Sequence, residues 1–135
     1  MFPEIVLGHL VGDYLFQNNW MALKKDKHNG LGTFTCTVHC CIYTLCVCIL
    51  MGVFSWQWVV YVFFSHFFID KFSLAEKWLR LIRGRSLGVF METLENHVYT
   101  PHIGLRAGFG TVVYAVVDNT MHLVLMWYGW KYFFQ

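Results

Sequence analysis

Charge is what this chain lacks most. Charged residues make up 13% of its 135 residues, about half the share of a typical soluble domain. The formal net charge is only +2, which argues against a nucleic-acid partner. Because 57% of the residues are hydrophobic, the composition also argues against disorder and against a two-domain soluble enzyme. The N-terminus has no basic stretch before its first apolar run, so we expect no signal peptide.

Long apolar stretches dominate the sequence instead. They cover residues 2–22, 31–54, 55–72 and 108–130. Each has about 18–24 residues, close to the ~20 that a helix needs to cross ~30 Å of hydrocarbon. We therefore predict a single all-α domain over residues 1–135. It would be a polytopic membrane bundle of about four transmembrane helices, with one long connection at 73–107.

The basic residues give the predicted bundle an orientation. All Lys and Arg residues except Lys131 belong to the first and third connections or their edges. Short loops rich in these residues stay in the cytoplasm, so we expect both connections to be cytoplasmic and both termini to lie outside. We expect an integral protein of the bacterial inner membrane, with membrane lipid as its partner.

The long connection begins with an amphipathic pattern. Its apolar residues at helical spacing are Leu74, Trp78, Leu81 and Ile82, and its polar residues are Glu76, Lys77, Arg80 and Arg83. This pattern predicts an amphipathic helix that lies on the cytoplasmic leaflet or continues the third span. A solvated basic loop is the alternative reading.

The five cysteines all fall in the second apolar stretch. A disulfide framework would spread them among loops, so we expect reduced, buried thiols that let helices approach closely. Cys36, His39 and Cys40 lie on neighbouring helical turns, which leaves open a metal shell made by these three residues. No second cysteine cluster completes such a shell.

The other polar residues inside the apolar stretches are few and come in pairs. They are His9 with Asp13 and Gln17, His39 alone, His66 with Asp70, and Asp118 with His122. Each His/Asp pair is four residues apart, and residues i and i+4 lie on one face of a helix. Three predicted helices therefore each present one His beside one Asp, and the fourth presents one His.

Carboxylates at this depth need compensation. A charge inside a bilayer is costly unless it is paired, and several Asp in one bundle repel each other. No Lys or Arg lies in the central parts of the stretches. We therefore predict one or two divalent ions, with zinc first and manganese or iron as alternatives. The predicted ligands are His9, Asp13, His39, His66, Asp70, Asp118 and His122.

Counting along the predicted helices gives these ligands two depths. His9/Asp13 and Asp118/His122 match each other, whereas His39, His66 and Asp70 form a shallower group. One two-metal site and two separate sites both fit this layering. A proton or cation relay without a fixed metal, and polar packing between helices, are the other readings of the same residues.

Three motifs carry a resemblance to a known family. They are H-L-V-G-D-Y-L-F-Q at 9–17, H-F-F-I-D at 66–70 and D-N-T-M-H at 118–122. Together with His39 they resemble an uncharacterised bacterial and phage domain of unknown function, whose small integral membrane proteins carry H-x3-D-x3-Q, H-x3-D and D-x3-H motifs. The resemblance implies a compact membrane bundle with a shared polar core. More loosely, paired H-x-x-x-D helices are similar to zinc phospholipases C and nucleases, and to membrane-bound metal-dependent hydrolases.

The expected activity follows from such a centre. Two metal ions can activate water and hold the oxygens of a phosphoester, so we expect a membrane-embedded hydrolase of a phospholipid or lipid-linked ester. The predicted catalytic residues are Asp13, Asp118 and Gln17, and the predicted headgroup-binding residues are Lys24, Lys25 and Lys71. One alternative is a cation or proton carrier, which would need a homo-oligomer to widen its pathway. The other is a non-enzymatic membrane interaction protein with a structural metal.

Overall fold

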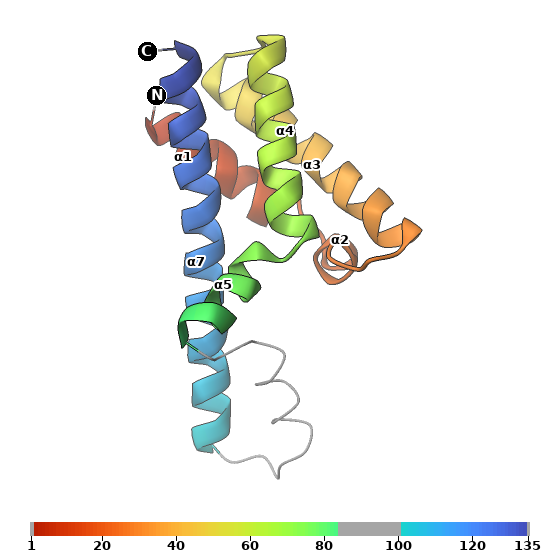
Figure 1. The fold of residues 1–135 in the computed structure, drawn as a ribbon, viewed down its shortest axis with the longest axis vertical. Coiled ribbons are helices and arrows are strands. Elements are labelled where there is room, and N and C mark those ends of the chain that lie inside the picture. Colours follow the sequence, from red (N-terminus) through yellow and green to blue (C-terminus); the bar gives the residue numbers. More distant parts are fainter. Residues whose placement is uncertain (1, 84–100, 135) are drawn as a thin grey trace. The chain divides into compact units, whose positions relative to one another are not determined.

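The computed structural model describes residues 2–83 and 101–134. Every regular element in these ranges is a helix (Figure 1), as predicted. The elements are α1 (Phe2–Leu10), η1 (Val11–Leu15), α2 (Asn19–Lys24), α3 (Gly30–Met51), α4 (Trp56–Lys71), α5 (Leu74–Arg83) and α7 (Pro101–Phe134). They belong to two compact units. Unit 1 comprises Met1–Phe72 with Met121–Gln135, and unit 2 comprises Ser73–Thr120.

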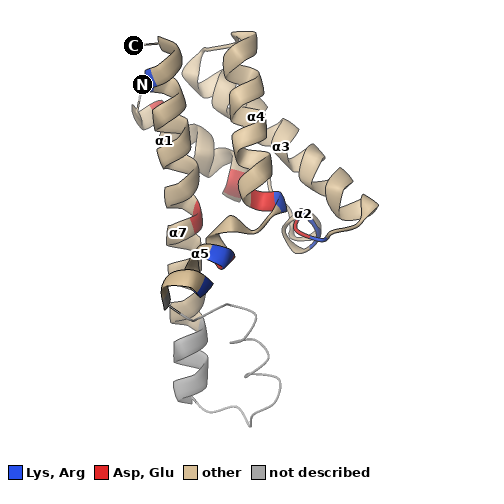
Figure 2. Cartoon of the chain, in the orientation of Figure 1, with Lys and Arg blue, Asp and Glu red and all other residues tan. Residues whose placement is uncertain are grey.

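Two helices are long and apolar enough to cross a membrane. They are Gly30–Met51, which is α3, and Gly108–Phe134 within α7. A third span is reached only if α4 and α5 count together as one broken span. Figure 2 shows α3 free of Lys, Arg, Asp and Glu along its whole length, with the charges of α4 confined to its end. These helices are compatible with a membrane protein, and the predicted count of four spans is not confirmed.

The first predicted span, residues 2–22, is broken in the structure. α1 runs directly into η1, a π-helical segment, and the regular helix ends at Phe16. The 9 residues of α1 and 5 of η1 reach at most about 21 Å, which is short of the ~30 Å hydrocarbon core. Asn18 then adopts an extended conformation, accepts a hydrogen bond from the Met21 N–H at 2.9 Å, and starts α2.

The bounds of α3 follow from its two caps. Asn29 accepts a hydrogen bond from the Gly32 N–H at 2.7 Å and starts the helix. Gly52 ends it in the left-handed conformation, with φ 66°, which glycine adopts readily. Between these caps α3 packs against α1, η1, α2 and α4. It is therefore the helix around which unit 1 is built.

Two glycines let the N-terminal segment approach α3 closely. A Cβ atom on Gly8 would lie 2.9 Å from the Val47 Cα, and one on Gly12 would lie 2.7 Å from the Tyr43 Cδ2. Small residues four apart are a common device for close helix contact in membranes. The contact brings η1, and with it Asp13, against the middle of α3.

The apolar core of unit 1 lies beside the polar residues described below. Its buried members are Ile5, Tyr43, Val47, Cys48, Met51, Trp58, Val62 and Met126. The outward faces of the helices are also apolar. Leu45 and Ile49 on α3 and Phe64 and Phe68 on α4 are between 49% and 58% exposed. Apolar residues on the outside as well as the inside are expected of helices that face lipid.

Unit 2 contains α5 and the first part of α7. α5 confirms the helix predicted from the amphipathic pattern, and its apolar Trp78 and Leu81 are exposed. On its polar side, the Arg80 Nη2 lies 3.8 Å from the Glu76 Oε1. α7 begins at Pro101, seven residues ahead of the predicted span 108–130. Residues 84–100 of the predicted connection lie outside the described residues.

Candidate metal centre

Four elements of unit 1 each bring polar side chains to one place in its interior. Asp13 comes from η1, His39 from α3, His66 and Asp70 from α4, and His122 from α7. The three imidazoles and Asp70 are at most 5% exposed. His66 and Asp70 share a face of α4 because they are one helical turn apart. The centre thus gathers one or two side chains from each element that contributes to it.

The shortest distances join two histidines and two carboxylates. The Nε2 atoms of His39 and His66 are 2.9 Å apart. Asp13 Oδ1 lies 3.1 Å from the His39 Nε2 and 3.3 Å from the His66 Nε2. Asp70 Oδ2 lies 3.2 Å from each of these nitrogens. Neighbouring ligand atoms of a tetrahedral zinc site, with bonds of about 2.0–2.1 Å, lie about 3.3 Å apart. The two histidines therefore form, with either carboxylate, a triangle of the size of one face of a metal tetrahedron.

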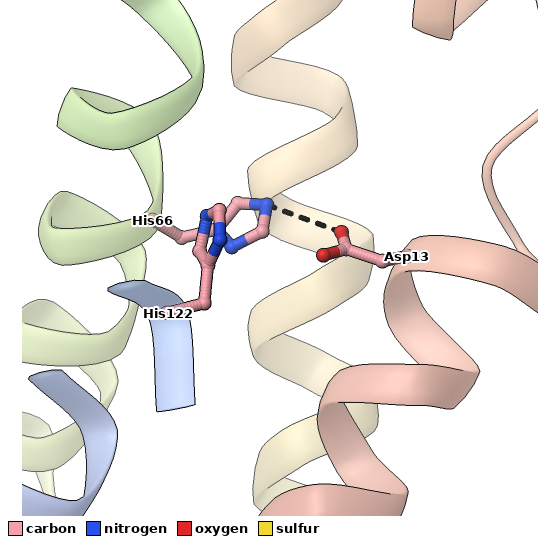
Figure 3. A group of neighbouring side chains, drawn as sticks. All are labelled: Asp13, His66 and His122. Atoms are coloured by element: carbon pink, nitrogen blue, oxygen red, sulfur yellow. Dashed lines mark ion pairs between the residues drawn. The ribbon is translucent and has the colours of Figure 1, made fainter. Parts of the chain in front are cut away.

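His122 extends the centre on the side of α7. Its Nε2 lies 3.7 Å from Asp70 Oδ1, and its ring centroid is 4.2 Å from that of His66. Figure 3 shows Asp13, His66 and His122 turned toward one another from three different elements. Within the described residues, two groups could hold a metal ion: Asp13/His66/His122 and His39/His66/Asp70. His66 belongs to both groups.

The hydrogen-bonding pattern suits a set of ligands. Asp13 Oδ1 is buried and makes no hydrogen bond among the described residues, whereas Asp70 Oδ2 is paired with the Lys25 ammonium at 2.6 Å. Buried polar atoms without such partners are uncommon and costly. The facing Nε2 atoms of His39 and His66 are both acceptors when each imidazole carries its proton on Nδ1. In that tautomer, the two nitrogens and the two carboxylate oxygens converge as acceptors on one region, while the two Nδ1 atoms make no hydrogen bond among the described residues.

Tyr43 is the residue that the sequence reasoning missed. Its ring stacks on His66 with centroids 3.6 Å apart, and its hydroxyl lies 3.0 Å from the His9 Nδ1 and donates to the Met126 sulfur at 3.3 Å. His9 Nδ1 in turn lies 3.4 Å from Asp13 Oδ2. The available signal was spacing, because Tyr43 follows His39 by one helical turn and shares its face of α3.

The three predicted headgroup lysines have different positions. Lys25 reaches the centre, where its Nζ lies 2.6 Å from Asp70 Oδ2, and it also donates to Gln17 Oε1 at 3.3 Å. Gln17 therefore contacts the centre through Lys25. Lys24 lies over the Trp20 ring, 5.7 Å from its centroid. Lys71 is buried and donates to the Lys27 carbonyl at 2.7 Å.

Other candidates stand outside the two groups. Asp118 is half-buried and belongs to unit 2. Cys36 and Cys40 are buried, and their sulfur atoms are 3.9 Å apart. Among the described residues, neither of the two metal-type groups contains Asp118 or a thiol.

The layering expected from the sequence differs from the arrangement in the structure. Asp13 and His122 join the group of His39, His66 and Asp70 that was expected to lie at a separate depth. The depths had been counted along straight helices, whereas the N-terminal segment ends as a π-helix after α1. Asp13 lies within this π-helical segment, with its Oδ1 3.1 Å from the His39 Nε2.

The fold and the centre define a class of protein. It is a helical protein with helices long and apolar enough to span a membrane, and with buried His/Asp groups that could hold a metal ion. A family model described as "Protein of unknown function (DUF3307)" matches residues 1–135, so the chain belongs to this uncharacterised family. This match confirms the resemblance to a domain of unknown function. No curated protein and no solved structure matches the chain.

Proposed function

We propose that this protein is a membrane-embedded, metal-dependent hydrolase that cleaves an ester in a phospholipid or lipid-linked compound. One observation carries the proposal. The Nε2 atoms of His39 and His66 and the oxygen Asp70 Oδ2 form a buried triangle with sides of 2.9, 3.2 and 3.2 Å. Three protein ligands with a fourth position left for water or substrate are typical of catalytic rather than structural zinc sites.

The chemistry follows from this ligand set. Two imidazoles and a carboxylate suit zinc, and a divalent ion there would supply a Lewis acid that activates water. Asp13 is then the general base, since its Oδ1 lies within 3.3 Å of both imidazole nitrogens. The water oxygen bonds to the ester carbon or phosphorus, and Asp13 takes the water proton. The ester bond breaks, and the leaving oxygen departs as an alcohol after taking that proton from Asp13.

Neighbouring side chains contact the proposed ligands and the proposed base. His122 lies 3.7 Å from the other oxygen of Asp70, and His9 lies 3.4 Å from the other oxygen of Asp13. Tyr43 stacks on His66 and fixes the plane of its ring. Partners of this kind orient ligands and typically change metal affinity about 10–100-fold when they are lost.

The surroundings of the centre favour a lipid substrate. The helices that carry it keep apolar faces outward, with Leu45, Phe64 and Phe68 each about half exposed. A compound with acyl chains dissolves among such faces, whereas a polar metabolite does not. The ester would then reach the polar centre from the membrane.

The test is metal analysis and lipid turnover on one set of purified variants. We expect about one transition-metal ion per chain in the detergent-solubilised protein, lost in Asp70→Ala because the ligand is removed. Asp13→Asn should keep the metal and lose lipid turnover by about 100-fold or more, as expected for a general base. Asp26→Asn is the matched control, since Asp26 is exposed. A metal-free wild type, or full turnover in Asp13→Asn, would contradict the proposal.

A cation carrier is the second candidate, and one observation favours it. The groups Asp13/His66/His122 and His39/His66/Asp70 share His66, so an ion could pass from one group to the other without leaving the interior. Intramembrane ionisable residues often mark such pathways. Metal flux into vesicles that contain the protein, abolished by His66→Ala, would support the carrier. Turnover of lipid without flux would support the hydrolase.

A further inference from the structure

Lys25 brings a positive charge to the centre itself. Its Nζ lies 2.6 Å from Asp70 Oδ2, the same oxygen that is 3.2 Å from the His39 and His66 nitrogens. The Lys25 side chain is 16% exposed, whereas that of Asp70 is 2% exposed. The ammonium thus reaches the buried carboxylate from a more open side.

The other two candidate lysines are engaged elsewhere. Lys71 donates to the Lys27 carbonyl, and Lys24 lies over the ring of Trp20. Lys25 is instead held between Asp70 and Gln17, whose Oε1 lies 3.3 Å from its Nζ. Gln17 is neutral, so it orients the ammonium without offsetting its charge.

The loaded centre would hold two cationic groups side by side. A divalent ion among His39, His66 and Asp70 would share the oxygen Asp70 Oδ2 with the Lys25 ammonium. Adjacent cationic groups repel each other, so an anion that contacts both is favoured.

We infer that Lys25 and the metal form a phosphoryl-binding subsite, so the substrate of the proposed hydrolase is a phosphoester rather than a carboxylic ester. This inference rests on the proposed function. A phosphodiester carries one negative charge on two non-bridging oxygens. One oxygen can take the open metal position, and the other can accept a hydrogen bond from the Lys25 ammonium. A carboxylic ester is neutral and offers the ammonium no charged oxygen.

The test uses the full-length protein in detergent, loaded with cobalt(II), which reports its ligands by visible absorption. Inorganic phosphate should change the cobalt spectrum of the wild type, and Lys25→Gln should weaken the apparent phosphate affinity about tenfold or more. Lys27→Gln is the matched control, because it removes the same charge from an exposed side chain nearby. It should leave the phosphate affinity unchanged.

A second measurement needs no variant and covers the case in which Lys25→Gln does not fold. Phosphate should slow the acetylation of Lys25 in the cobalt-loaded wild type, while Lys27 in the same sample stays equally reactive. Protection by phosphatidylglycerol in the micelle at a lower concentration than by inorganic phosphate would identify a lipid headgroup as the source. Protection by inorganic phosphate alone would identify a free phosphate compound. Either result supports the subsite.

The failures of the two proposals can be told apart. The wild type could bind cobalt but show no spectral response to phosphate, or show the same response as Lys25→Gln. Either outcome contradicts the phosphoryl-binding subsite and leaves the metal centre unaffected. Acetylation of Lys25 at the same rate with and without either phosphate source does so too. If the wild type binds no cobalt, the subsite and the proposed hydrolase both fall.

Discussion

His39 and His66 face each other through their Nε2 atoms at 2.9 Å, although they come from different helices, α3 and α4. Such a pair has two explanations. One ring can donate a proton to the other, or both can turn their lone pairs toward a shared cation. Two carboxylate oxygens lie within 3.3 Å of the pair, which is compatible with the shared cation that we propose. This relationship is the basis of the first prediction.

Replacing either member of the pair by glutamine should abolish metal binding. His39→Gln and His66→Gln keep a polar side chain of similar size but lose the imidazole ligand, so we expect bound metal to fall about tenfold or more. Elemental analysis of the purified variants measures this. His28→Gln is the control, because His28 is an exposed histidine outside the centre. If the two variants retain the metal content of the wild type, the pair holds no ion.

Tyr43 should act through its ring more than through its hydroxyl. Tyr43→Phe keeps the ring that stacks on His66 but removes the group bonded to His9 and Met126, so we expect a loss of about 1 kcal/mol in unfolding free energy. Tyr43→Ala also leaves a cavity in the core, for which the expected loss is about 3–5 kcal/mol. Thermal unfolding in detergent, followed by circular dichroism, compares them. Equal losses in both variants would show that the ring contributes little.

The sequence predicts the types of residue in the centre, but not which of the candidate residues lie together in it. Helical periodicity predicts that a His and an Asp four residues apart lie on one face of a helix. Which faces meet depends on the register between helices, and nothing in the local pattern sets it. Asp13 lies in the π-helical segment that follows α1, and Lys25 lies at the end of α2, from which it reaches Asp70 on α4. Tyr43 was missed because an aromatic residue in an apolar helix is usually core.

The fold was predicted in class but not in the number of spans. Residues 2–22 are apolar enough to suggest one helix, and hydropathy does not register the break at Phe16 or the cap at Asn18. The 16 residues of α4 also fall short of a full span, since they reach only ~24 Å at ~1.5 Å per residue. By contrast, α3 carries Asn at its start and Gly at its end, and its bounds lie close to the predicted ones.

Gly12 should be intolerant of even a methyl group. In Gly12→Ala the new Cβ would lie 2.7 Å from a ring carbon of Tyr43 and 3.1 Å from its Cα. Because the backbone of α3 cannot yield easily, we expect a loss of about 1–3 kcal/mol in unfolding free energy. We also expect slower lipid turnover, since Asp13, the proposed general base, is the next residue. Gly110→Ala is the matched control, because nothing lies within 4 Å of a Cβ there. A Gly12→Ala protein as stable as the wild type would contradict this close approach.

Removal of the metal should lower the stability of the protein without unfolding it. The helices of unit 1 also share an apolar core that needs no ion, with Val47, Trp58 and Met126 at its centre. A chelator should therefore lower the midpoint of thermal unfolding while leaving the helical signal at low temperature intact. Restored zinc at 100 times its dissociation constant should return about 2.7 kcal/mol, and Asp70→Ala should show no response to either treatment. Complete loss of helical structure on chelation would instead identify a structural metal, and the catalytic reading of the centre would then fail.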